Sequence, residues 1–263
     1  MHLGTVAHRN VDIIVPRSMM NRVAIDMVVR QIRHTLEQKS REHQELLRDL
    51  GQQVEDQPLP SGVHLLDQTN QIKGMCTIIQ DPLTKDVDFN FYFDRLSAII
   101  VERALEHMNF SSRTIEAPNG NKYNGLIPCG EVSAVVILRG GSCMETGLRR
   151  VIPECKTGRM LIQSSFRTGE PELHYLSLPH DIAEHDKVLL LDPQMSSGGA
   201  ALMAVRVLVD HGVKEQNIVL VTVFAGRMGL TRLLMVFAGI HVLVVEIGKD
   251  GVERWLEKRY FRC

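Results

Sequence analysis

Apolar residues along the chain gather in short continuous runs, separated by segments with helical periodicity. Four runs have the length of a β-strand and are apolar on both faces, namely 132–138, 188–191, 218–224 and 242–247. Runs of this kind are typical of strands in parallel sheets that are covered on both sides. The pattern therefore predicts an α/β fold with a central, mostly parallel sheet flanked by helices.

Helices are expected between these strands. Apolar residues recur every three or four positions over 94–108 and over 200–211, as they do on the buried face of a helix. A further helix is expected to follow a glycine-bearing turn at Arg139 and to extend to about Val151. Strands that alternate with helices along the chain favour parallel pairing, because a parallel connection needs a crossover element.

Other segments predict antiparallel pairing. The segment 113–126 contains two Asn-Gly dipeptides, which favour the tight turns of a hairpin. Strands are also expected at 159–163 and 173–178, on either side of a turn at Thr168-Gly169.

The first sixty residues have a different character. A short apolar run at 11–15 predicts a strand, and helical periodicity over 21–50 predicts a long helix with a charged second half. The segment 51–62, which contains two prolines, has the composition of a linker. We therefore expect an N-terminal helical extension within 1–50, a linker at 51–62 and the main domain at 63–263.

Composition narrows the possible partners. The chain has 263 residues and a net charge of -1, which does not indicate a nucleic-acid partner. Met1–Asn10 has no long apolar stretch, and no run approaches about 18 apolar residues, so neither secretion nor a membrane span is expected. Five scattered cysteines without a C-x-x-C motif predict free thiols in a reducing cytoplasm. Eleven histidines show no metal-ligand spacing, so no protein-held metal is expected.

The most informative segment is Asp192-Pro193-Gln194-Met195-Ser196-Ser197-Gly198-Gly199, which lies between a predicted strand and a predicted helix. A small-residue loop that opens a helix forms an anion site, because the first N–H groups of a helix lack partners and its dipole is positive there. Ser196 and Ser197 add two hydroxyl donors, so the loop is suited to a phosphate group.

Asp192 has to be explained separately, because a carboxylate repels phosphate. An ionised carboxylate only accepts hydrogen bonds and is therefore suited to the hydroxyl pair of a ribose whose phosphate lies in the loop. The alternative is structural: a glycine-rich turn caps a helix, and Asp192 merely ends a strand.

This segment also carries a family resemblance. The string V-L-L-L-D-P-Q-M-S-S-G-G-A resembles the 5-phosphoribosyl diphosphate (PRPP) loop of type I phosphoribosyltransferases, in the form typical of uracil phosphoribosyltransferases. Colinear agreement continues at Gln71-Ile72-Lys73-Gly74, Phe91-Tyr92-Phe93-Asp94-Arg95-Leu96, Val136-Ile137-Leu138-Arg139-Gly140-Gly141 and Gly169-Glu170-Pro171-Glu172-Leu173-His174-Tyr175. The same strings resemble the phosphoribosyltransferase-like half of eukaryotic uridine kinases, particularly the fungal type.

The resemblance implies the type I phosphoribosyltransferase fold and a PRPP site. By this resemblance, Arg139 lies where the family contacts diphosphate, and Asp192–Gly199 lies where it holds the ribose 5-phosphate; Arg139 and Asp192 are the expected catalytic residues. The positions expected to bind PRPP, as its Mg²⁺ complex, are Arg139, Gly140, Gly141, Asp192, Pro193, Gln194, Met195, Ser196, Ser197, Gly198, Gly199 and Ala200. Without the family pattern, an arginine after a strand is as often a solvated charge.

The chain departs from the family at two places. Ser164 stands where the family commonly has an arginine that reaches the diphosphate, and Arg167 is a candidate substitute. The C-terminal segment 249–261 keeps an R-Y-F ending but lacks the glycine-rich part whose backbone reads uracil. Losing such hydrogen bonds can cost several orders of magnitude in specificity. Trp255, in the same segment, is expected to pack in the core and has base stacking as the alternative.

Three functions are therefore weighed. The first, which is favoured as the family's usual activity, is an enzyme that transfers the phosphoribosyl group from PRPP to uracil and yields UMP and diphosphate in pyrimidine salvage. The second is a catalytically impaired domain that binds PRPP or a nucleotide and regulates a uridine kinase, with UMP, UTP or GTP as a candidate effector. The third and weakest is a structural dimerisation module. We expect a homo-oligomer, either a dimer or a tetramer.

The segment 1–50 resembles the last strand and helix of a uridine kinase domain, through the string Asp12-Ile13-Ile14-Val15-Pro16-Arg17. No G-x-x-x-x-G-K-[ST] motif occurs in the sequence, so kinase activity by this chain alone is not expected.

Overall fold

A computed structural model describes residues 22, 25–36, 38–39, 42, 58–165, 170–250 and 252–262. The strand predicted at 11–15, the turn at Thr168-Gly169 and the candidate residue Arg167 lie outside the described residues. Within 21–50, residues 25–36 are helical, as expected, and the side chains of Ile25, Ile32 and Leu36 are exposed. Among the described residues, no helix combines the length and the apolar character that crossing a bilayer requires.

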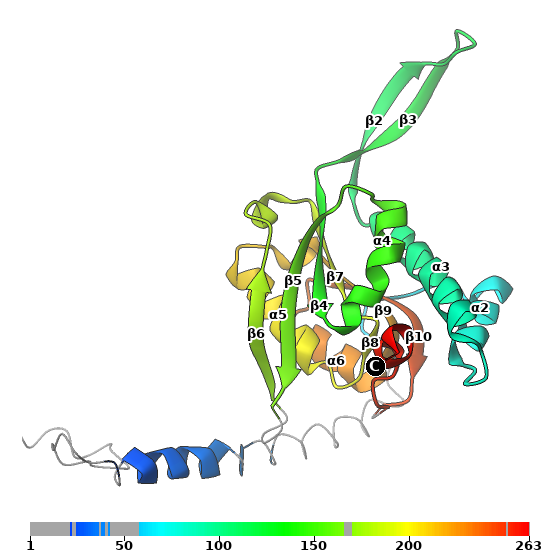
Figure 1. Ribbon diagram of the computed structural model, residues 1–263. Helices are drawn as coiled ribbons and strands as arrows, with labels where there is room; N and C mark the ends of the chain where they lie inside the picture. Colours follow the sequence, from blue (N-terminus) through cyan, green and yellow to red (C-terminus); the bar gives the residue numbers. More distant parts are fainter. Residues whose placement is uncertain are drawn as a thin grey trace, which may run out of the picture.

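The main domain is built on an eight-stranded sheet (Figure 1). Its strands are β1 (Val63–Leu65), β4 (Val132–Leu138), β5 (Lys156–Ser164), β6 (Pro171–Ser177), β7 (Lys187–Leu191), β8 (Gln194–Met195), β9 (Ile218–Gly226) and β10 (His241–Gly248). They are ordered β1-β10-β9-β7-β4-β5-β6, with β8 paired to the far end of β9. All pairs are parallel except β5 with β6. The predicted sheet is therefore confirmed.

Helices cover both faces of this sheet. Its strand residues alternate between two apolar clusters, as they do at Ala134 and Val135 of β4, because successive side chains of a strand point to opposite faces. One face packs against α2 (Asn70–Gln80), α3 (Asp86–Leu105), α4 (Glu145–Val151) and α7 (Leu256–Phe261). The other packs against α5 (Gly199–Asp210) and α6 (Arg227–Val236). This is the type I phosphoribosyltransferase arrangement expected from the sequence.

Two helices differ from the prediction. Helix α3 begins at Asp86, eight residues before the predicted start, and its first turn carries two acidic residues, which the helix dipole favours there. Helix α2 was not predicted, although Ile72, Met75 and Ile79 bury one of its faces. Thr69 caps it by accepting a hydrogen bond from the Ile72 N–H (3.3 Å).

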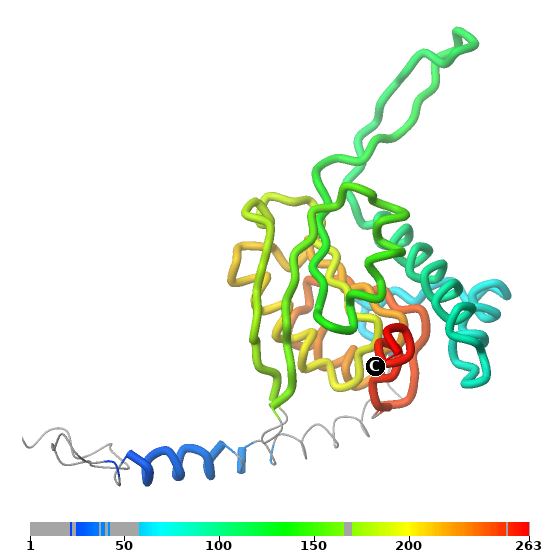
Figure 2. Tube along the Cα trace, viewed as in Figure 1, coloured from blue at the N-terminus to red at the C-terminus, as the bar shows by residue number. Residues whose placement is uncertain are grey.

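A hairpin extends away from the sheet. Strands β2 (Asn109–Glu116) and β3 (Lys122–Cys129) pair antiparallel around the predicted Asn119-Gly120 turn. The second Asn-Gly dipeptide, at Asn124, lies inside β3 and does not form a turn. Figures 1 and 2 show the hairpin standing clear of the helices and the sheet.

Candidate functional site

The predicted phosphate loop connects β7 to α5 at the carboxyl edge of the sheet, where open α/β sheets bind ligands. Gly198, just before α5, has a φ of 77°, a left-handed conformation that favours glycine. Gly229 of α6 lies against the loop so closely that a Cβ there would clash with the Ser196 carbonyl oxygen. Two glycines thus allow the loop and α6 to approach each other.

The second glycine turn lies beside the first. After β4 the chain continues through Arg139 into a short 3-10 helix, η2 (Gly140–Met144), and the Leu138–Arg139 peptide is cis. Gly141 packs against the Leu191 carbonyl oxygen, so the ends of β4 and β7 bring the two turns together. The Arg139 side chain is exposed, whereas Gly140 and Gly141 are buried.

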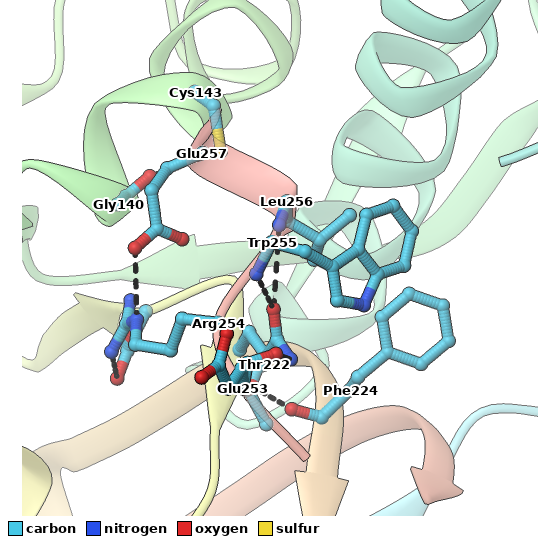
Figure 3. Close-up of polar contacts among 11 residues, drawn as sticks. Gly140, Cys143, Thr222, Phe224, Glu253, Arg254, Trp255, Leu256 and Glu257 are labelled. Carbon is cyan, nitrogen blue, oxygen red and sulfur yellow. Dashed lines mark hydrogen bonds and ion pairs between the residues drawn. The ribbon is translucent and has the colours of Figure 1, made fainter. Parts of the chain in front are cut away.

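Asp192 does not face an open ribose pocket, because it is paired with the C-terminal segment. Its side chain is only 1% exposed, and Arg254 donates from Nη2 to Oδ1 (2.6 Å) and from Nη1 to Oδ2 (3.3 Å). Arg254 Nε donates to Glu257 Oε1 (3.1 Å), so the guanidinium lies between two carboxylates (Figure 3). This two-pronged geometry is the strongest arrangement available to an arginine and a carboxylate.

Burial sets the electrostatics of this pair. It raises the pKa of Asp192, and the charge and hydrogen bonds of Arg254 oppose that rise. Burial also works against the charge of Arg254, but Asp192 and Glu257 outweigh it and hold its pKa above the ordinary value. The remaining oxygen of Glu257, Oε2, is buried and has no hydrogen-bond partner among the residues that the structure describes. The Arg254 guanidinium also covers Gly140, where a Cβ would clash with it.

Gln194 joins the loop to the same segment. Its side-chain nitrogen donates to the Glu253 carbonyl oxygen (2.9 Å), and its side-chain oxygen accepts from the N–H groups of Trp255 (2.9 Å) and Leu256 (3.4 Å). The polar group of Gln194 is therefore engaged within the protein, and Gln194 is buried.

The end of the chain is held against α3 by further contacts. Tyr260 Oη donates to Asp94 Oδ1 (2.7 Å), and the Arg259 guanidinium lies over the Phe89 ring, 4.7 Å from its centroid. Trp255 is partly buried, with its ring 6.2 Å from that of Phe89 and 6.1 Å from that of Phe224. Its expected role in core packing is confirmed.

Two cavities flank this segment. The first, of about 410 Å³, is lined by Arg139, Gly140, Ser164, Ala200, Arg254 and Glu257, among others. The second, of about 370 Å³, is lined by Gln194, Met195, Ser196, Gly226, Gly248 and Trp255, among others. Both lie at the carboxyl edge of the sheet, and the segment carrying Arg254 and Trp255 separates them.

The predicted site residues thus fall into three groups. Arg139, Gly140 and Ala200 line the first cavity, and Ser196 lines the second. Ser197 is exposed in the loop, and Gly199 begins α5. The buried group comprises Gly141, Asp192, Pro193, Gln194, Met195 and Gly198, although Gln194 and Met195 also line part of the second cavity.

Sequence reasoning missed Arg254 and Glu257 as parts of the site. The only signal was that the charged segment 249–261 replaces the family's glycine-rich segment. That difference does not indicate which residues Arg254 and Glu257 contact.

The sheet order, the strand–loop–helix with its left-handed glycine and the adjoining second turn define a protein of the type I phosphoribosyltransferase class. A solved structure of the AQ2163 protein from Aquifex aeolicus has the same fold, with a TM-score of 0.65 and 21% identity over 76% of this chain and 97% of that one. Within the class, the family described as uracil phosphoribosyltransferase matches residues 65–253, and the chain belongs to that family.

Its curated relatives fall into two groups. Uridine-cytidine kinase-like 1 of Mus musculus is 39% identical over 92% of this chain but only 43% of its own length. Uridine kinase of Saccharomyces cerevisiae is 34% identical over 97% of this chain and 54% of its own length. Uracil phosphoribosyltransferase of Dictyostelium discoideum is 40% identical over 72% of this chain and 87% of its own length. The chain therefore spans about half the length of the kinase relatives that it matches.

Proposed function

We propose that this domain serves pyrimidine salvage by binding the ribose 5-phosphate end of PRPP or of a uridine nucleotide, and that it acts as a regulatory ligand-binding partner of a uridine kinase. The phosphate would lie on the N–H groups at the start of α5, beside Ser196 and Ser197. The relatives named as uridine kinases, which this chain matches over about half their length, support the link to a kinase.

The observation that carries this proposal is the pairing of Asp192 with Arg254. A ribose hydroxyl pair can reach the Asp192 carboxylate only through space that Arg254 fills, because Arg254 contacts both oxygens (2.6 and 3.3 Å) and the Asp192 side chain is only 1% exposed. A ligand must therefore displace Arg254 or bind without Asp192. Either route favours reversible binding over the firm positioning of the ribose ring that transfer requires.

Transfer to uracil is the second candidate, and the retained loop and second glycine turn favour it. The reaction breaks the bond between the anomeric carbon and diphosphate, forms a bond from that carbon to a uracil nitrogen and releases the proton that this nitrogen carried. Arg139 and the backbone N–H groups near Gly140 would stabilise the leaving diphosphate. The second cavity would hold the base.

We expect Mg²⁺ to reach the site bound to the ligand, not to be held there by the protein beforehand. Both carboxylates near the first cavity, Asp192 and Glu257, are paired with Arg254. Among the described residues that line the cavity, none offers a carboxylate pair free of Arg254 for a resident ion. We therefore expect the diphosphate of PRPP to bring Mg²⁺ into the site, where the ion would neutralise part of its charge.

Two measurements on the same preparation test the proposal. Calorimetry with Mg²⁺-PRPP, UMP, UTP and GTP should detect saturable binding of at least one phosphoribosyl ligand. An assay with labelled uracil and Mg²⁺-PRPP should detect no UMP above background. Formation of UMP would replace the proposal by the transferase function, and a failure to bind any of these ligands would leave the structural role.

A further inference from the structure

Three histidines that are far apart in the sequence meet at the opposite edge of the sheet. His64 lies in β1, His241 begins β10, and His107 follows the end of α3. Since β1 and β10 are parallel neighbours in which His64 pairs with Leu243, His64 and His241 lie on the same face. That face is the one packed against α3.

The ring nitrogens of these histidines are close enough to share one ion. His64 Nε2 and His241 Nδ1 are 3.1 Å apart, and one nitrogen from each of the three residues lies within 4.8 Å of the others. The ring centroids are 4.7, 5.3 and 4.7 Å apart. Nitrogens bound to one tetrahedral ion at about 2.0–2.1 Å lie a little over 3 Å from each other, so the first pair already has ligand spacing.

One buried nitrogen of the cluster is poorly satisfied by the protein. His107 Nδ1 is buried and has no hydrogen bond of normal geometry within the described structure, although the ring still interacts with the Ala104 backbone. A buried polar atom without a partner is unfavourable, and such an atom calls for an unseen ligand or a specific role. In an imidazole, a nitrogen that is not protonated can bind a metal directly.

A buried lysine, Lys187, lies near the cluster and acts on His107 and His241 through its charge. Lys187 does not enter the cluster as a hydrogen-bond partner, because its Nζ donates to the Gln216 carbonyl oxygen (3.0 Å).

We propose that His64, His107 and His241 form a binding site for a divalent transition metal, with Zn²⁺ as the preferred class of ion and water in the fourth position. Imidazole nitrogen suits Zn²⁺, Ni²⁺ and Cu²⁺, whereas Mg²⁺ and Ca²⁺ require oxygen ligands. The positive charge of Lys187 opposes any cation here, so binding depends on the bonds from the imidazole nitrogens, which Zn²⁺ forms and Mg²⁺ and Ca²⁺ do not favour.

A bound metal would link β1, at the edge of the sheet, to β10 and to the chain that follows α3. Strand β1 has only three residues and pairs only with β10 among the described strands. His64 would tie this strand to β10, and His107 would tie both to the chain between α3 and the hairpin. Gly248 at the second cavity lies seven positions beyond His241 along β10, about 23 Å for an extended strand, so the role is structural and independent of the proposed function.

A second group with metal-ligand spacing is a weaker candidate. Glu131, Asp181 and His185 also lie together. Lys156 Nζ already donates to both carboxylates, at 2.7 and 2.6 Å, so an ammonium group stands where a metal ion would have to bind.

The test uses the full chain without a histidine tag, in metal-free buffer. Calorimetry with ZnCl₂ should show one tight site per chain that MgCl₂ does not fill. Each of His64→Gln, His107→Gln and His241→Gln should weaken Zn²⁺ binding by about 100-fold or more, since even the groups that support a ligand contribute roughly 10–100-fold. His180→Gln, which changes an exposed histidine outside the cluster, should leave the affinity unchanged.

Two further readouts do not depend on the variants folding well. Co²⁺ bound to the unaltered chain should show the intense visible absorption of a tetrahedral site, and Zn²⁺ should raise the unfolding temperature. The proposal would be overturned by the absence of a one-to-one site, by three histidine variants that bind Zn²⁺ as tightly as the unaltered chain, or by loss of the site in Asp181→Asn but not in the histidine variants.

Discussion

At the scale of single residues, Arg254 decides how the site works. It pairs with Asp192 and approaches Gly140, so under the proposed function it would occupy the space of the ribose hydroxyls and border that of the diphosphate. A buried ion pair contributes little net stability compared with apolar packing, but removing one partner leaves a costly lone charge. Arg254 is therefore both a structural partner of Asp192 and a competitor of the ligand.

Arg254→Met separates these two roles. We expect the free energy of unfolding to fall by about 2 kcal/mol, because Asp192 is left buried and unpaired while methionine keeps part of the packing. We also expect PRPP to bind at least tenfold more tightly, because the competitor is gone. Urea unfolding and calorimetry measure the two effects.

Lys214→Met, which changes an exposed cation outside both cavities, should change neither quantity appreciably. Unchanged or weaker PRPP binding by the Arg254 variant would contradict the competition.

Tyr260 links the end of the chain to α3 in a way that alkaline pH should reveal. Burial, the larger cause, and the Asp94 carboxylate raise the pKa of Tyr260 to about 12 from the ordinary 10. Below pH 10 the hydroxyl is protonated in both states; between pH 10 and 12 only the unfolded state loses the proton, so stability falls. The urea midpoint should therefore decrease across this window.

Other groups also titrate there, so the informative quantity is the difference between the unaltered chain and Tyr260→Phe. The variant should lose less stability from pH 10 to 12. Parallel curves would show that Tyr260 does not carry the effect.

At the scale of elements, the site depends on how closely α6 approaches the phosphate loop. Gly229 of α6 packs against the Ser196 carbonyl oxygen, and Arg232 Nη1 donates to the Ser197 carbonyl oxygen (3.3 Å). The Asp250 carboxylate accepts from the Met228 N–H (3.0 Å) and thereby caps the first turn of α6. The loop therefore takes its shape from a neighbouring helix as well as from its own glycines.

Two glycine-to-alanine changes test this packing, because they are expected to change the free energy of unfolding in opposite directions. Gly229→Ala should lower the free energy of unfolding by about 1–3 kcal/mol and weaken phosphoribosyl binding, because the new methyl group meets backbone. Gly74→Ala, in the middle of α2 with open space around it, should raise the free energy of unfolding by about 0.5–1 kcal/mol. Urea unfolding compares them, and a neutral Gly229→Ala would contradict the close approach.

At the scale of the whole molecule, the proposed ligand site and the proposed metal site lie at opposite edges of the parallel sheet. The phosphate loop, the second glycine turn and both cavities lie at the carboxyl edge, and the three histidines lie at the other. The hairpin stands away from both and exposes Phe110, Ile115, Tyr123, Leu126 and Ile127. A two-stranded ribbon is at best marginally stable alone in water, and grouped exposed apolar side chains mark contact surfaces.

We therefore expect the hairpin to contact a second copy of the chain, in line with the oligomer expected from the sequence. Ile115 and Tyr123 are directly opposite each other on one face of the ribbon, with Tyr123 61% exposed. Replacing both by serine should lower the mass measured by light scattering to that of a monomer. Leu83→Ser, at an exposed site on the loop before α3, should not. A monomeric unaltered chain would contradict this expectation.

The sequence alone predicted most of the sheet and the loop at 192–199 between a strand and a helix, because both are local features. An apolar run of strand length predicts a buried strand wherever it lies, as at 132–138, and a small-residue string before a helix forms an anion site through its own backbone. The early start of α3 and the existence of α2 were missed, since tertiary burial supports segments with a weak local pattern.

Contacts between distant residues were decided by the tertiary structure. Asp192 and Arg254 are 62 positions apart, and His64 and His241 are 177 apart, so no spacing rule connects them. The parallel sheet brings distant strand ends to one edge. Because Asp192 and Arg254 are buried there, the attraction between their charges is stronger than it would be in water. The sequence thus predicted a phosphate site, and the fold determined that an arginine of the same chain already holds its carboxylate.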